Sequence, residues 1–123
     1  MYLTFIAGIG GFFGTILRYL LNIFIYQIID YPGFPYGTLI INLLGCLLIG
    51  VIAGFSESRI TLTPELRIFF QIGMLGGFTT FSTFGYETFR LLQEGQLFFA
   101  ILNISFQVVV GILAVWIGYQ LCR

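Results

Sequence analysis

Residues 73–84 read Gly-Met-Leu-Gly-Gly-Phe-Thr-Thr-Phe-Ser-Thr-Phe and lie in the middle of a long apolar segment. These twelve positions hold three glycines and four hydroxyl side chains. A glycine inside a helix costs about 1 kcal/mol, and Thr and Ser side chains offer the backbone competing hydrogen bonds. We therefore expect the helix to be broken between Gly76 and Ser82.

A helix break at membrane depth is tolerated only where the freed backbone groups are buried in protein or line a cavity. The break is therefore a candidate ion site. Its carbonyls can bind a cation, its amides and hydroxyls can donate to an anion, and the ring edges of Phe81 and Phe84 carry the positive end of the aromatic quadrupole. The alternative is a kink softened by glycine, with the phenylalanines facing lipid.

The composition is that of an integral membrane protein. Of the 123 residues, 59% are hydrophobic and only 8% are charged, whereas about a quarter of a soluble domain is charged. The formal net charge is +0 and there is no lysine, so a nucleic-acid-binding patch has no support. Without histidine or paired intramembrane carboxylates, an enzyme is not expected. Cys46 and Cys122 stand in no zinc or CxxC spacing, so we expect both to be reduced.

Turn signals divide the chain into four apolar lengths, and a bilayer core needs about 20 apolar residues per helix. We expect helices over residues 3–29, 36–55, 64–92 and 96–121, which form one transmembrane domain over residues 1–123. Pro32 and Pro35 end the first helix, and Pro64 can occupy the first turn of the third. Because the loops are short, the function must lie inside the membrane.

Small residues recur at four-residue spacing in the first two predicted helices. Such spacing lets helix backbones approach closely, so we interpret these positions as packing faces. Four helices can pack together without enclosing a pore, and a conduit would therefore need a second copy of the chain. The pairs are Ala7 and Gly11, Gly10 and Gly14, and Gly50 and Gly54.

Polar side chains in the first two helices are candidates for function or for pairing, because burying them in lipid is costly. Arg18 either has such a role or extends its charge to the interface near Asp30. Asn42 either hydrogen-bonds a neighbouring helix or donates N–H to an anion.

The third and fourth helices carry further polar positions. Glu87 and Arg90 have the spacing of a helical ion pair, which we expect at the interface. Asn103 and Gln107 are four residues apart and therefore share one face of the last helix.

The arginines give only a weak orientation signal. Arg59, Arg67 and Arg123 are expected on one side of the membrane, with Arg90 and, if it extends outward, Arg18 on the other. A chain with so small a bias is expected to insert in both orientations, which makes an antiparallel homodimer possible. Two carbonyls from the break in each copy would then present four oxygens to a small hard cation.

Three motifs resemble the CrcB/Fluc family of fluoride channels over nearly the whole chain. They are Gly-Gly-Phe-Thr-Thr-Phe-Ser-Thr-Phe at 76–84, Gly11-x-x-Gly14-x-x-x-Arg18-Tyr19, and Thr-Leu-Ile-Ile-Asn-Leu-Leu-Gly at 38–45. The resemblance implies an all-α membrane protein of four transmembrane helices, the third broken near the midplane, that forms an antiparallel, dual-topology homodimer. It also implies a passive channel that exports fluoride across the bacterial inner membrane and so reduces its toxicity in the cytoplasm.

The resemblance further implies roles for individual residues. The backbone carbonyls of Gly76 and Thr79 would hold a structural sodium ion at the dimer centre, and Arg18 would be structural. The fluoride pathway would contain Asn42, Phe81, Phe84, Ser82 and Thr83, with a more polar lining of Thr38, Glu87, Asn103 and Gln107.

The chemistry of fluoride agrees with these residues. Fluoride is small and strongly hydrated, so its path must replace water with many weak donors and avoid deep traps. Two other functions remain open. A small dual-topology multidrug or cation exporter would need a carboxylate in the first helix, where none precedes Asp30. In a non-transporting membrane subunit, the polar residues of the break would serve only packing.

Overall fold

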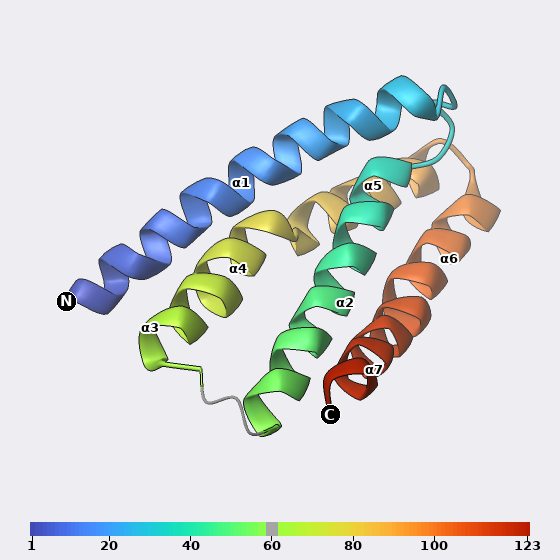
Figure 1. The fold of residues 1–123 in the computed structure, drawn as a ribbon. Coiled ribbons are helices and arrows are strands. Elements are labelled where there is room, and N and C mark those ends of the chain that lie inside the picture. Colours follow the sequence, from blue (N-terminus) through green and yellow to red (C-terminus); the bar gives the residue numbers. More distant parts are fainter. Residues whose placement is uncertain (59–61) are drawn as a thin grey trace.

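The computed structural model describes residues 1–58 and 62–123, and every regular element in these ranges is a helix (Figure 1). The first two segments are the continuous helices α1 (Tyr2–Ile28) and α2 (Tyr36–Glu57). The third segment comprises α3 (Pro64–Arg67), the π-helix η1 (Ile68–Met74), α4 (Leu75–Phe78) and α5 (Phe81–Gln93). The fourth comprises α6 (Leu97–Ser105), the π-helix η2 (Phe106–Val110) and α7 (Gly111–Cys122). The ends of the four segments lie within two residues of the expected ones.

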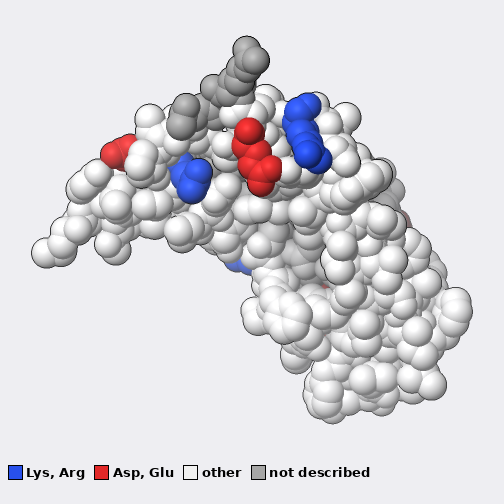
Figure 2. Space-filling model, turned by 90° about the horizontal axis from the view of Figure 1, so that it is seen from below, with Lys and Arg blue, Asp and Glu red and all other residues white. Residues whose placement is uncertain are grey.

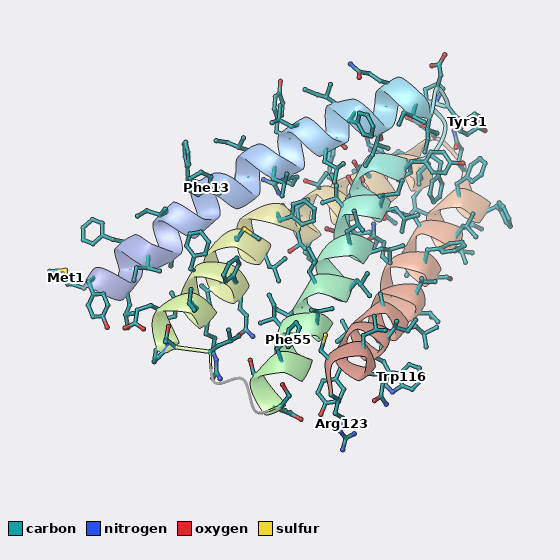
Figure 3. The ribbon with its side chains drawn as sticks, in the orientation of Figure 1. Met1, Phe13, Tyr31, Phe55, Trp116 and Arg123 are labelled. Atoms are coloured by element: carbon teal, nitrogen blue, oxygen red, sulfur yellow. The ribbon has the colours of Figure 1, made fainter. Side chains whose placement is uncertain are left out.

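The predicted all-α membrane fold is confirmed. By length and composition α1, α2 and the fourth segment, Leu97–Cys122, can each span a membrane. Large apolar side chains cover the outside of the bundle, and Phe13 and Trp116 point away from it (Figure 3). Most of the surface seen in Figure 2 is uncharged, and the acidic and basic groups gather along one side.

The four segments pack mainly as two pairs, the first with the third and the second with the fourth. Helix α1 lies along η1 and α4, while α2 lies along α7. Both termini lie at the end of the bundle where α2 leads to α3, and the α1–α2 and α5–α6 loops lie at the other end (Figure 1). The chain therefore crosses the bundle four times, as the topology prediction requires. Arg59, which that prediction counted, lies outside the described residues.

Glycines provide the close helix contacts, as predicted from their spacing. A Cβ at Gly14 would meet the carbonyl oxygen of Met74, and a Cβ at Gly50 would meet that of Val115. Gly54 likewise lies against the main chain of Tyr119. These contacts hold α1 against the third segment and α2 against the fourth, and so fix the elements around the break.

The break in the third segment is confirmed and lies at Thr79 and Thr80. Their main chain is extended, with φ −86° and ψ 159° at Thr79 and φ −151° and ψ 115° at Thr80. In a continuous helix the Thr80 N–H would donate to the carbonyl of Gly76. It donates instead to Oδ1 of Asn42, at 2.9 Å. Helix α5 restarts with Thr80 as its N-cap, because Thr80 Oγ1 accepts from the N–H of Thr83 at 3.3 Å.

Three smaller features concern Pro64, the two cysteines and the π-helical stretches. Pro64 does occupy the first turn of the third segment, where Thr63 caps the N–H of Leu66 at 3.3 Å. Cys46 and Cys122 are both free thiols, as expected. The π-helical stretches η1 and η2 were not predicted: the third and fourth segments were expected to be α-helical outside the break.

Candidate functional site

The side-chain amide of Asn42, on α2, makes two hydrogen bonds to the main chain of Thr80 at the break, and we call this pair of bonds the clamp. Oδ1 of Asn42 accepts from the Thr80 N–H at 2.9 Å, and Nδ2 donates to the Thr80 carbonyl oxygen at 3.2 Å. Nδ2 also donates to Oε1 of Gln107, at 3.0 Å. Asn42 thus hydrogen-bonds neighbouring segments, and an anion can reach its amide only by displacing one of these two acceptors.

A groove of about 360 Å³ lies beside the break. Phe81 and Phe84 line it with their ring centroids 5.5 Å apart, which confirms that they share one face of α5. Phe81 is 83% exposed, so its ring edge is open to a ligand or to a second chain. Gln107 also lines the groove, and its buried Nε2 has no hydrogen-bond partner among the described residues. The remaining polar lining includes Asn42, Gly76, Thr79 and Thr80.

A second cavity, of about 220 Å³, lies between α1, α2 and α5, and we call it the α1 cavity. Its lining includes Arg18, Thr38, Thr83 and Glu87. Thr38 Oγ1 donates to Oε1 of Glu87 at 2.8 Å. Nη1 of Arg18 lies 3.5 Å from the carbonyl oxygen of Thr79, so this charge is directed at the break and not at the Asp30 interface.

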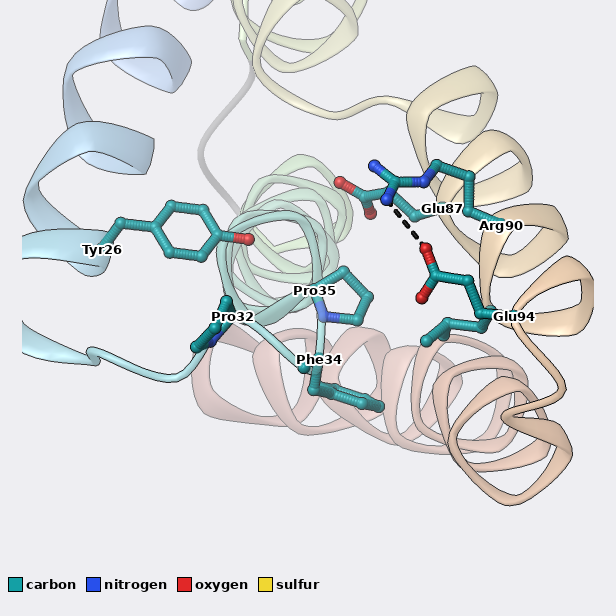
Figure 4. A pocket seen from close by; sticks show the side chains of 9 residues that line it. Tyr26, Pro32, Phe34, Pro35, Glu87, Arg90 and Glu94 are labelled. Carbon is teal, nitrogen blue, oxygen red and sulfur yellow. Dashed lines mark hydrogen bonds and ion pairs between the residues drawn. The ribbon is translucent and has the colours of Figure 1, made fainter.

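A third cavity, of about 170 Å³, lies at the loop end of the bundle, and we call it the mouth (Figure 4). Tyr26 lines it from α1, and Glu87, Arg90 and Glu94 line it from the other side. Nη2 of Arg90 pairs with Oε1 of Glu94 at 2.9 Å. The predicted ion pair of Glu87 and Arg90 is therefore wrong. Glu87 faces α2 and bonds Thr38, while Arg90 lies on the exposed side and reaches the residue four positions on.

Two residues each line two of the three cavities. Thr80 lines both the groove and the α1 cavity, and Glu87 lines both the α1 cavity and the mouth. The polar lining therefore extends from the break to the loop end of the bundle. Thr83 lies along this polar lining, in the α1 cavity, and the exposed Ser82 places its Oγ 3.3 Å from Oγ1 of Thr80.

Asn103 lies apart from these cavities. It is completely buried, and its Nδ2 donates to Oγ1 of Thr88 between α6 and α5, at 3.0 Å. Gln107 instead meets Asn42 on α2. The structure therefore does not bring Asn103 and Gln107 to one partner.

The carbonyls of the break have the chemistry of a site for a hard cation. The carbonyl of Gly76 has lost its helical donor to Asn42, and Gly76 itself is exposed. Among the described residues, the Thr79 carbonyl accepts only the long contact from Arg18. Carbonyl oxygens suit hard cations, but two from one chain are too few to enclose an ion. The carbonyls of Gly76 and Thr79 fit a sodium ion only if a second chain supplies the same two carbonyls.

Sequence reasoning missed Thr80, which joins two cavities and receives both bonds of the clamp. The available signal was the adjacent pair of threonines at a point where helix is disfavoured. Nothing local linked this pair to Asn42, which is 38 residues away.

Comparison with known proteins covers almost the whole chain. The family model described as CrcB-like protein, Camphor Resistance (CrcB), matches residues 5–119. A protein of Citrifermentans bemidjiense named Fluoride-specific ion channel FluC is 47% identical over 121 residues, which are 98% of this chain and 96% of that protein. Proteins of the same name are 48% identical in Geobacter metallireducens and 45% identical in Clostridium perfringens, each over 122 residues. These alignments cover 98% of this chain, and 98% and 94% of those two proteins.

Proposed function

The chain belongs to the CrcB-like protein family, and from this premise we propose that it is a passive, fluoride-selective channel. The observation that carries the proposal is that relatives aligned over 98% of the chain are named fluoride-specific ion channels. Function is assigned from a site as well as from a fold, so the cavities must offer what fluoride needs.

The groove and the α1 cavity support this function because they offer several weak donors. The groove contains the ring edges of Phe81 and Phe84 and the unpartnered Nε2 of Gln107. The α1 cavity adds the hydroxyl of Thr83. Donors of this kind replace part of a hydration shell without holding the anion in a deep trap. We propose that fluoride moves from the groove past Thr80 into the α1 cavity and on to the mouth.

We assign the remaining residues of the path by the cavities they line. Thr38 and Glu87 form the polar lining between the α1 cavity and the mouth, where fluoride would pass the Glu87 carboxyl in its neutral form, since a carboxylate would repel the anion. Ser82 supplies a hydroxyl at the start of α5. Asn103 supports this path indirectly, since its bond to Thr88 fixes α5.

We further propose that the channel is an antiparallel homodimer with a structural sodium ion at its centre. Gly76 is exposed beside the groove, so a two-fold axis there would bring the carbonyls of Gly76 and Thr79 from both chains together. When bound, the ion would add positive potential that favours entry of an anion. Arg18 approaches the same Thr79 carbonyl, so the ion would use the other lone pair of that oxygen.

Growth in fluoride tests the proposed physiological role. Bacteria that lack a fluoride exporter stop growing above a certain fluoride concentration. When the same bacteria express this chain, they are expected to grow at that concentration. The same cells exposed to equal sodium chloride control for salt. Identical growth with and without the chain, although the protein is in the membrane, would contradict export of fluoride from the cytoplasm.

Reporter fusions test the antiparallel arrangement. Reporters that are active only in the cytoplasm or only outside it, fused after Arg123, are both expected to be active, because the arginine bias is too small to fix one orientation. A matched fusion in which three lysines follow Arg123 should show one orientation only. A single orientation for the unmodified chain would rule out dual topology.

A further inference from the structure

We infer that Thr80 is a further residue of the fluoride path that contacts the anion, at the partition where the anion passes from the groove into the α1 cavity. This inference rests on the proposed channel function. Thr80 lines both cavities, whereas Phe81 and Phe84 line only the groove and Thr83 only the α1 cavity. An anion that moves between the two cavities must therefore pass this residue.

The main chain of Thr80 is held at both its N–H and its carbonyl group. Asn42 accepts from its N–H at 2.9 Å and donates to its carbonyl at 3.2 Å, and Gln107 holds the same Asn42 amide at 3.0 Å. The bond from the Thr80 N–H to Asn42 replaces the helical bond that the break removes. The two bonds to Asn42 also fix where the Thr80 side chain stands, and they do so for any side chain at this position because only backbone atoms of residue 80 take part.

The hydroxyl of Thr80 organises the polar groups on both sides of the partition. Its Oγ1 accepts from the Thr83 N–H at 3.3 Å, donates to Thr83 Oγ1 at 3.0 Å and lies 3.3 Å from Ser82 Oγ. Because Thr83 Oγ1 accepts this bond, the proton of the Thr83 hydroxyl is available to the α1 cavity. By rotating, the Thr80 hydroxyl can instead donate to an anion in the groove.

A neutral hydroxyl suits a partition between two sites. It offers a partially dehydrated anion one donor while the anion leaves the groove, and it carries no charge that would hold the anion there. A methyl group at the same place would offer no donor, so the anion would cross the partition without compensation for its lost water. We therefore expect the Thr80 hydroxyl to set the rate of passage.

Single-channel recording in planar bilayers separates this role from simple helix capping. The current through one open channel does not depend on how many molecules fold, so a lower current in assembled channels is not explained by lower stability alone. Thr80→Val is expected to lower the single-channel fluoride current by at least about tenfold, a change of about 1.4 kcal/mol in the barrier. Thr80→Ser keeps the hydroxyl and is expected to remain within about twofold of the wild type.

Thr63→Val is the matched control, because Thr63 caps α3 through the same Oγ1 contact to a backbone N–H, also at 3.3 Å, but lines none of the three cavities. Its single-channel current should equal that of the wild type. If Thr80→Val does not assemble, Thr80→Ser and Thr80→Ala form a second pair that differs only in the hydroxyl, and Ala should carry at least about tenfold less current.

Equal currents in Thr80→Val and the wild type, or in the Ser and Ala variants, would overturn the role of Thr80 and leave the channel function standing. A wild-type chain that assembles but carries no fluoride current would overturn both. The two failures are therefore distinguishable in one set of recordings.

Discussion

Replacing Asn42 with aspartate is expected to lower fluoride efflux from vesicles by roughly a thousandfold at neutral pH. A carboxylate about 4 Å from the anion raises its energy by about 4 kcal/mol at an effective dielectric constant of about 20. Each 1.4 kcal/mol or so of barrier is about a factor of ten. The substitution also removes the Nδ2 donor to the Thr80 carbonyl, a hydrogen bond worth about 1 kcal/mol. The thermal stability of the purified protein should fall accordingly.

A charge placed elsewhere controls for nonspecific effects on Asn42→Asp. Gln120→Glu adds the same charge at an exposed position of α7, and its efflux rate is expected to match the wild type. An Asn42→Asp variant that conducts normally would show that Asn42 only joins α2 to its neighbours and that fluoride does not pass near it.

Phe81→Ile and Phe84→Ile are each expected to reduce fluoride flux by about tenfold or more while the assembly stays intact. Isoleucine retains an apolar side chain but has no ring edge to face the anion. The two rings lie 5.5 Å apart along the groove, so each contributes a separate weak site. Flux is measured with a fluoride electrode, and size-exclusion chromatography of the purified protein reports the assembly.

Phe89→Ile provides the matched control for these two variants. Phe89 is on the same helix and is 55% exposed, but it lines none of the three cavities. Its flux is expected to be that of the wild type. Unchanged flux in both Phe81→Ile and Phe84→Ile would exclude the ring edges as fluoride sites.

The four segments and the break were predictable because their causes are local in the sequence. Pro32 and Pro35 stop the first helix whatever surrounds them, and the glycines and threonines of 73–84 disfavour helix by their own propensities. The π-helices were not predictable in the same way. Helix η1 packs along α1, and such irregular turns depend on contacts with other segments.

The residues around the break were predictable, but their bonds were not. Sequence spacing paired Glu87 with Arg90, whereas Thr38, which is 49 residues from Glu87, binds its carboxylate in the folded chain. The clamp likewise joins Asn42 to a residue on another segment. Hydrogen bonds between segments depend on how the helices are rotated against one another, and helical periodicity in one segment does not determine this rotation.

Halide efflux from liposomes that contain only the purified chain tests the central claim most directly. Vesicles loaded with potassium fluoride and potassium chloride are placed in a potassium-poor solution, and valinomycin is added so that a passive anion current is balanced by potassium. Through a passive, fluoride-selective channel, fluoride is expected to leave only after valinomycin is added, and chloride is expected to stay inside. Equal release of both halides, or release of neither, would contradict the proposed channel function.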